Sequence, residues 1–124
     1  MTINKTTKNL TTADFQSTIS ENPIVIVDFW ASWCGPCRAF APIFDRSAQS
    51  HPDVLHAKVD TEAQQQLAAA LEIQAIPTIM AFRDGVLVYR QPGAMPAAAL
   101  EDLIARVKAL DMDDVRAKVA AARR

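Results

Sequence analysis

The amino-acid sequence predicts a single α/β domain, and two observations carry that prediction. Apolar stretches typical of strands alternate with stretches whose apolar residues recur at helical spacing, a pattern that indicates βαβ units with a parallel core sheet. Near the end of this pattern, Asp84-Gly85 separates two apolar runs and indicates a hairpin that adds an antiparallel edge. The chain has 124 residues, 50% of them hydrophobic, and is long enough to bury a core without a disulfide framework or a metal.

The first half of the chain predicts a helix, a strand and a second helix. Residues 5–10 are a candidate edge strand, although they are mostly polar. Thr11 and Asp14 have the spacing of a capping box and precede apolar residues at helical spacing. Residues 24–31 are apolar without alternation, so we expect a strand buried on both faces. Directly after residues 34–37, apolar side chains at a spacing of four predict the second helix.

The second half predicts another strand, a short helix, the hairpin and a last helix. Residues 54–60 read as a buried strand, and residues 62–71 as a short amphipathic helix. Residues 78–82 and 86–89 form the two arms of the hairpin. Apolar residues at helical spacing within 96–110 mark the last helix, which faces the core. Right-handed crossovers would place helices on both faces of the sheet.

Charge and hydropathy exclude several classes of protein. Thirteen basic and 14 acidic residues give a net charge of −1, so we expect no nucleic-acid partner. The longest apolar run, residues 24–33, contains an acid and covers only about half a membrane span, so we expect no membrane association. The segment before Phe15 lacks the apolar block of a signal peptide. We therefore expect a cytoplasmic protein, in which the two cysteines need a role other than a structural disulfide.

Cys34 and Cys37 form a C-x-x-C pair that has two interpretations. In the redox interpretation, a strand delivers Cys34 to the start of a helix, where the dipole and free N–H groups stabilise a thiolate. Cys34 attacks a disulfide, and Cys37, one turn further, resolves the mixed disulfide. In the zinc interpretation, His51 and His56 complete a finger-like spacing. Pro52 breaks the helix that both histidines would share, so we favour the redox pair and expect exposed histidines in a loop and at a strand edge.

Four further residues stand out around this pair. Asp28 lies in an apolar strand, so desolvation should raise its pKa; it is either a hydrogen-bonded structural acid or the proton acceptor for Cys37. Lys58, on the neighbouring predicted strand, either pairs with Asp28 or lies exposed. Trp33 either belongs to the core or shields the sulfurs and contacts substrate. Pro77 begins a strand, where base rates alone favour a trans bond.

The run of residues 27–37 resembles the active-site signature of thioredoxins. The similarity extends from about Leu10 to Leu110 and includes Ala41-Pro42, Lys58, Asp60, Ile76-Pro77-Thr78, Asp84-Gly85 and Gly93. The resemblance implies the thioredoxin fold, with a central mixed sheet of four or five strands flanked by four helices. It also implies a reductant of protein disulfides, with no bound cofactor beyond a redox-active Cys34–Cys37 disulfide. Nothing in the sequence demands more than a monomer, so we expect one. An NADPH-dependent flavoprotein, thioredoxin reductase, would return that disulfide to the dithiol.

We expect the residues of this chain that match the thioredoxin pattern to have the roles of the family's residues. Cys34 becomes the nucleophile and Cys37 the resolving thiol, assisted by Asp28 with Lys58 as its partner. Pro77 matches the family's cis proline, which reverses the expectation of a trans bond and leaves the Ile76 backbone free to pair with an extended substrate. The substrate-binding residues that the resemblance implies are Trp33, Gly35, Pro36, Ile76, Pro77 and Gly93.

The sequence also departs from the thioredoxin pattern. Ala75 replaces a glycine that is common before Ile-Pro, and Pro92 precedes Gly93, so the groove could differ in shape. Residues 112–124 extend beyond the usual end, and we divide the chain into a domain of residues 1–111 and an extension that is helical or loose. Two alternatives remain: an oxidase or isomerase of the same fold, and a binding module with incidental cysteines. Gly35-Pro36 favours the reductant, because the dipeptide lacks a histidine that would make the pair more oxidising.

Overall fold

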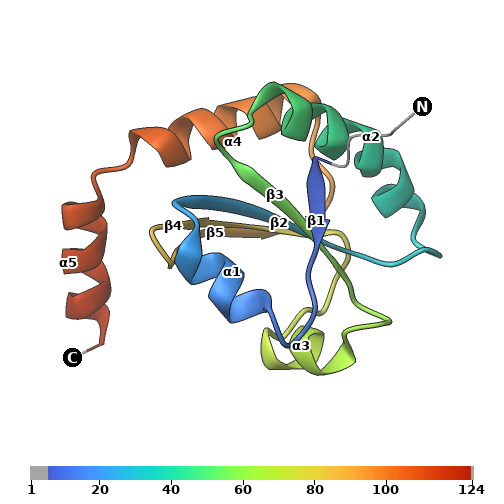
Figure 1. Ribbon diagram of the computed structural model, residues 1–124, viewed down its shortest axis with the longest axis horizontal. Helices are drawn as coiled ribbons and strands as arrows, with labels where there is room; N and C mark the ends of the chain where they lie inside the picture. Colours follow the sequence, from blue (N-terminus) through green and yellow to red (C-terminus); the bar gives the residue numbers. More distant parts are fainter. Residues whose placement is uncertain (1–5, 124) are drawn as a thin grey trace.

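The structure, a computed structural model, describes residues 6–123 and contains a five-stranded mixed sheet with helices on both faces (Figure 1). Across the sheet the strands lie in the order β1 (Thr7–Asn9), β3 (Leu55–Asp60), β2 (Ile24–Trp30), β4 (Thr78–Arg83) and β5 (Val86–Pro92). The first three are parallel, whereas β4 is antiparallel to β2 and β5 is antiparallel to β4. The parallel core and the hairpin are therefore confirmed, and the candidate edge strand of residues 5–10 is confirmed over Thr7–Asn9, while residue 5 lies outside the described residues.

In the described part of the chain, four helices cover the sheet and a fifth follows them. α1 (Phe15–Glu21) and α3 (Gln65–Ala70) pack on one face, and α2 (Gly35–Ser50) and α4 (Ala97–Ala109) pack on the other. α5 (Met112–Ala122) extends past the end of α4 (Figure 1). Helices on both faces and a helical C-terminal extension match the expectations from the sequence.

β2 lies at the centre of the sheet because its side chains are apolar on both faces. Alternate residues enter two hydrophobic clusters, one beneath α1 and α3 and one beneath α2 and α4. The first cluster contains Val25, Val27 and Phe29, and the second contains Ile24 and Ile26. Each such side chain stabilises the fold by about 1.5–3 kcal/mol when fully buried. This burial makes β2 a rigid support for the segment that follows it.

Two helix starts show how local polar groups set the element boundaries. The Thr11 N–H donates to Asp14 Oδ1 at 2.7 Å and the Asp14 N–H donates to Thr11 Oγ1 at 3.3 Å, which confirms the predicted capping box before α1. α3 begins at Gln65, later than predicted, because Asp60 Oδ1 accepts the N–H groups of Glu62 and Ala63 and holds a turn there. The shorter α3 leaves this turn on the surface next to the end of β3.

The expectation of an exposed His56 at a strand edge is wrong, because its side chain is fully buried. β1 pairs with the outer side of β3, which makes β3 an interior strand. His56 Nδ1 lies 3.0 Å from the Val54 carbonyl oxygen, and Nε2 lies 2.9 Å from Ser47 Oγ. Because a carbonyl only accepts, Nδ1 carries the proton and Nε2 accepts from the Ser47 hydroxyl. Burial lowers the pKa of His56 and keeps the ring neutral.

The junction of α4 and α5 is held by the tip of the β4–β5 hairpin. Arg83 Nη1 donates to the carbonyl oxygens of Val107 and Lys108, at 2.7 and 3.2 Å, near the end of α4. Asp111 caps α5 by accepting backbone N–H groups of its first turn. The Met112 side chain is buried, and Arg116 lies 3.8 Å from a carboxylate oxygen of the hairpin turn.

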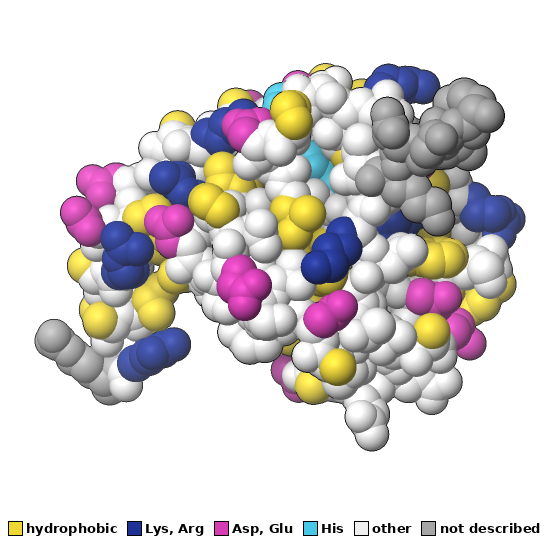
Figure 2. Space-filling model, in the orientation of Figure 1, with side chains coloured by type: hydrophobic (Ala, Val, Ile, Leu, Met, Phe, Trp, Pro, Cys, Tyr) yellow, Lys and Arg dark blue, Asp and Glu magenta, His cyan; other side chains and the backbone are white. Residues whose placement is uncertain are grey.

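The surface carries both signs of charge. Acidic and basic side chains are interspersed over the face shown in Figure 2, in keeping with the net charge of −1. Among residues 6–123, no helix is both long enough and apolar enough to cross a membrane.

Candidate functional site

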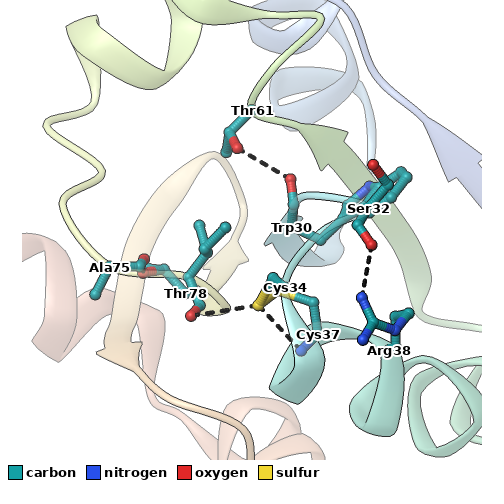
Figure 3. Close-up of a disulfide and its surroundings, with 9 residues drawn as sticks. Trp30, Ser32, Cys34, Cys37, Arg38, Thr61, Ala75 and Thr78 are labelled. Atoms are coloured by element: carbon teal, nitrogen blue, oxygen red, sulfur yellow. Dashed lines mark hydrogen bonds between the residues drawn. A yellow bond between two sulfur atoms is a disulfide. The ribbon is translucent and has the colours of Figure 1, made fainter.

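Cys34 and Cys37 form a disulfide at the start of α2, with their Cα atoms 5.2 Å apart (Figure 3). Cys34 is the N-cap of the helix, and Pro36 occupies its first turn, where a missing N–H costs no hydrogen bond. The Cys37 N–H donates to Cys34 Sγ at 3.2 Å. This N–H and the helix dipole act on the Cys34 sulfur and would stabilise its thiolate in the reduced state.

The beginning of β4 and the end of β5 meet beside the disulfide. Cys34 Sγ lies 3.7 Å from the Ile76 carbonyl oxygen, and the Ile76–Pro77 peptide bond is cis, as the resemblance implies. The Gly93 N–H donates to the Pro77 carbonyl oxygen at 2.7 Å, and Gly93 has a φ of 101°, which disfavours any residue with a Cβ. Ile76, Pro77 and Gly93, which are distant from Cys34 in the sequence, therefore converge on it.

Arg38 holds the loop that precedes the disulfide, a role that the sequence reasoning missed. Its Nη1 donates to the Ser32 carbonyl oxygen at 2.8 Å (Figure 3). Its only signal in the sequence is a basic residue one helical turn after Cys34. The neighbouring Trp33 side chain is 66% exposed, so it is not a core residue and is free to contact a bound molecule.

Asp28 is fully buried on β2, and neither of its carboxylate oxygens has a hydrogen-bond partner among the described residues. Burial raises the pKa of Asp28 to about 7, while the positive charge of Lys58 opposes that rise and the charge of Asp45 adds to it. No group among residues 6–123 is the hydrogen-bond partner that the structural interpretation of Asp28 requires. A carboxyl group that titrates near neutral pH can give or take a proton under physiological conditions.

Lys58 lies opposite Asp28 in the parallel register of β2 and β3. Within residues 6–123, Lys58 and Asp28 form no ion pair with each other. Lys58 Nζ instead lies 5.1 Å from the centre of the Trp30 ring. The cation–π contact keeps the ammonium group near the surface, whereas a direct bond to the buried carboxylate would strip its water. Lys58 acts on Asp28 through its charge at a distance.

A groove of about 380 Å³ runs beside the disulfide. Trp33 and Ile76 border it on the side of the cysteines, and α3, the turn before it and residues 73–75 form the rest of its lining. Ala75, which replaces the glycine common in thioredoxins, stands in this lining, and its carbonyl oxygen accepts a hydrogen bond from the Thr78 hydroxyl. The groove is open to solvent and lies next to the Ile76 backbone.

The histidines of the zinc interpretation lie with other partners. His56 binds Ser47 and Val54, and His51 caps α2 with its Nε2 2.9 Å from the Glu101 carboxylate on α4. Within residues 6–123 there is no cluster of three or more His, Cys, Asp and Glu side chains that could hold a metal ion.

Comparisons with known proteins agree with the geometry of this site. The family model Thioredoxin matches residues 6–106. The chain is 50% identical to the "Putative thioredoxin 2" of Streptomyces coelicolor over 114 residues, which cover 92% of this chain and 85% of that protein. It is 42% identical to Thioredoxin 1 of Synechococcus elongatus, over 77% of this chain and 91% of the relative.

Solved structures give the same result for the fold. A mutant thioredoxin from Halobacterium salinarum has a TM-score of 0.78 at 31% identity and covers 90% of this chain and 99% of its own. The oxidized form of mitochondrial thioredoxin 3 from Saccharomyces cerevisiae has a TM-score of 0.73 at 33% identity, over 84% and 95% of the two chains.

Proposed function

Because this chain belongs to the thioredoxin family, we propose that it carries electrons to disulfide-containing proteins of the cytoplasm. It has the thioredoxin fold and is a thiol-disulfide oxidoreductase that reduces protein disulfides. Its redox-active group is the Cys34–Cys37 disulfide. The observation that carries the proposal is the position of this disulfide, at a helix start, beside the Ile76 carbonyl and an open groove.

The proposed reaction transfers two electrons in two exchanges. In the dithiol form, the Cys34 thiolate attacks one sulfur of the substrate disulfide, which forms a mixed disulfide and releases one substrate thiolate. Cys37 then gives up its proton and attacks Cys34 Sγ, which closes the Cys34–Cys37 disulfide and releases the second substrate thiolate. Both substrate sulfurs leave reduced after taking up protons, and the disulfide that remains is the state described above.

We propose that Asp28 accepts the proton of Cys37 in the second exchange. A pKa of about 7 supports this role, because a base works best when its pKa lies near the working pH. Lys58 would assist by opposing the rise of that pKa, since its charge favours the carboxylate. Asp28 stands on β2, the strand that leads directly into the loop of Cys34.

The substrate-binding role is proposed for the residues that border the disulfide: Trp33, Gly35, Pro36, Ile76, Pro77 and Gly93. Exposure of Trp33 and the open groove support it. An extended segment of the substrate would pair with the backbone at Ile76, as an added strand pairs with a sheet edge. Main-chain pairing would let one site accept many protein sequences.

We further propose the cellular setting of this reaction. The chain would act as a monomer in electron transport and cell redox homeostasis, with residues 112–124 as an extension of the domain formed by residues 1–111. As for other thioredoxins, the partners are protein disulfides and a thioredoxin reductase. We propose that this reductase is a flavoprotein that draws its electrons from NADPH.

The test is reduction of insulin disulfides by the purified protein in the presence of a dithiol reductant. The wild-type protein should accelerate the reaction, and Cys34→Ser should abolish the acceleration. Cys37→Ser is the matched control, because it keeps the nucleophile and, once reduced and freed of the dithiol, should accumulate a mixed disulfide with the substrate. Full turnover by Cys34→Ser would refute the assignment of the nucleophile. A reduction potential nearer to about −120 mV, the value of a strong dithiol oxidant, than to about −270 mV, the value of thioredoxin, would instead favour the oxidase alternative.

A further inference from the structure

Arg90, an exposed residue of β5, binds the C-terminal end of α3. Its Nη1 donates to the Leu71 carbonyl oxygen at 2.7 Å, and its Nη2 donates to the Glu72 carbonyl oxygen at 2.8 Å. A helix leaves its last carbonyl groups without partners, and the planar guanidinium binds one of them, at the C-cap Leu71, together with the carbonyl of the residue that follows it. Two bonds from one rigid group fix the direction of the chain as well as its position.

The chain turns sharply at the point that Arg90 binds. Glu72 has a φ of 54°, in the left-handed region that favours glycine. The Glu72 N–H donates to the Ala69 carbonyl and the Ile73 N–H donates to the Ala68 carbonyl, which are the two bonds of a Schellman motif. The left-handed conformation is unfavourable for a residue with a Cβ, such as Glu72. The hydrogen bonds from Arg90 therefore stabilise a backbone conformation that Glu72 alone would disfavour.

The segment that leaves this turn forms a wall of the active site. Ile73 to Ile76 line the groove beside Trp33, and the Ile76 carbonyl oxygen lies 3.7 Å from Cys34 Sγ. The same strand that carries Arg90 ends next to Gly93, whose N–H binds the Pro77 carbonyl. β5 therefore holds residues 72–77 at both ends, through Arg90 at one end and Gly93 at the other.

We propose that Arg90 is a positioning residue for the reduction of protein disulfides. By fixing the turn at Glu72, it sets the direction of residues 73–76 and hence the backbone that an extended substrate pairs with. A small disulfide needs only access to the Cys34 sulfur, whereas a protein disulfide also pairs with the backbone of residues 73–76. The role assigned to Arg90 rests on the proposed function and adds to it a preference for polypeptide over small-molecule disulfides.

Arg83 offers a matched control within the same hairpin. It binds the carbonyl oxygens of Val107 and Lys108 near the end of α4, so it makes the same kind of contact as Arg90. Arg83 lies opposite Ile24, at the start of β2, whereas the disulfide follows the end of β2. Loss of Arg83 removes a comparable contact at the far end of the sheet.

The experiment compares two substrates of the reduced protein, insulin and the small disulfide dithiobis(nitrobenzoate), by their second-order rate constants. Arg90→Ala should lower the constant for insulin about three- to ten-fold, and that for the small disulfide less than about two-fold. Arg90→Lys should give an intermediate ratio, because a single ammonium group replaces a two-pronged donor. Arg83→Ala should leave the ratio of the two constants within about two-fold of the wild-type ratio.

All variants are measured below their unfolding transitions, and Arg90→Lys decides the question if Arg90→Ala does not fold. A loss of folded protein lowers both constants equally, so it does not move the ratio. A ratio in the Arg90 variants that matches the wild type refutes the positioning role while leaving the proposed function intact. Failure of the wild type to reduce insulin refutes the proposed function itself.

Discussion

Replacement of Asp28 by asparagine is expected to stabilise the oxidised protein at neutral and alkaline pH. The side chain is fully buried, and burial raises its pKa from 3.8 to about 7. Between these two values the folded protein holds a proton that the unfolded chain has released, so the free energy of unfolding falls as the pH rises. The stability contributed by the protonated acid is complete below pH 3.8 and is lost as the pH rises through about 7. The total loss amounts to about 4 kcal/mol.

Denaturant unfolding of wild-type protein and Asp28→Asn at pH 5 and pH 8 measures this loss. The free energy of unfolding of the variant relative to the wild type should increase by about 3 kcal/mol from the lower to the higher pH. Other titrating groups act equally on both proteins and cancel in the comparison. Asp102→Asn, which changes an exposed carboxylate of α4, is the control and should follow the wild type. A difference between Asp28→Asn and wild type that stays constant from pH 5 to pH 8 would contradict the reasoning.

Three further predictions concern residues outside the disulfide. His56 has a lowered pKa because it is buried, so its own contribution to stability is lost as the pH falls below 6.5; in denaturant unfolding, the free energy of unfolding of His56→Gln relative to the wild type should therefore rise between pH 7 and pH 5, and a constant difference would contradict this. Glu72→Gly should raise the free energy of unfolding by up to about 1 kcal/mol, since glycine adopts a φ of 54° freely; a lower thermal midpoint would count against this. Arg83→Ala should expose the chain between α4 and α5 to limited proteolysis, and an unchanged cleavage rate would rule out Arg83 as the anchor of that junction.

Local patterns were sufficient to predict most of the fold. The continuous apolar run of β2 and the helical spacing that follows Cys37 are properties of neighbouring residues, so they are readable without the tertiary structure. The polar segment that forms β1 was the hardest strand to predict, because its pairing with β3 depends on the whole sheet. The error at His56 has a similar origin, since its side chain is covered by Phe44 and Ser47 of α2, a contact that depends on how the helix packs on the sheet.

The site was predicted in part by spacing and in part by resemblance. The C-x-x-C pair and the buried acid stand out in the sequence, because a charge within an apolar strand is unusual. The contacts of Arg38 and Arg90 do not stand out, because arginines that bind backbone carbonyls need no particular partner side chain. Lys58 shows a further limit: the register places it opposite Asp28, yet its ammonium group lies over the Trp30 ring.

Backbone carbonyl groups connect the three segments that meet at the disulfide. Arg38 binds the Ser32 carbonyl in the loop before it, Arg90 binds the turn that leads to Ile76, and the Gly93 N–H binds the Pro77 carbonyl. None of these contacts depends on the identity of the side chain at the acceptor position. The chain can therefore change side chains along the groove, as at Ala75, while the positions of Cys34 and the Ile76 backbone stay fixed. These contacts therefore fix the backbone at Ile76, with which an extended substrate is proposed to pair, through main-chain groups of both partners.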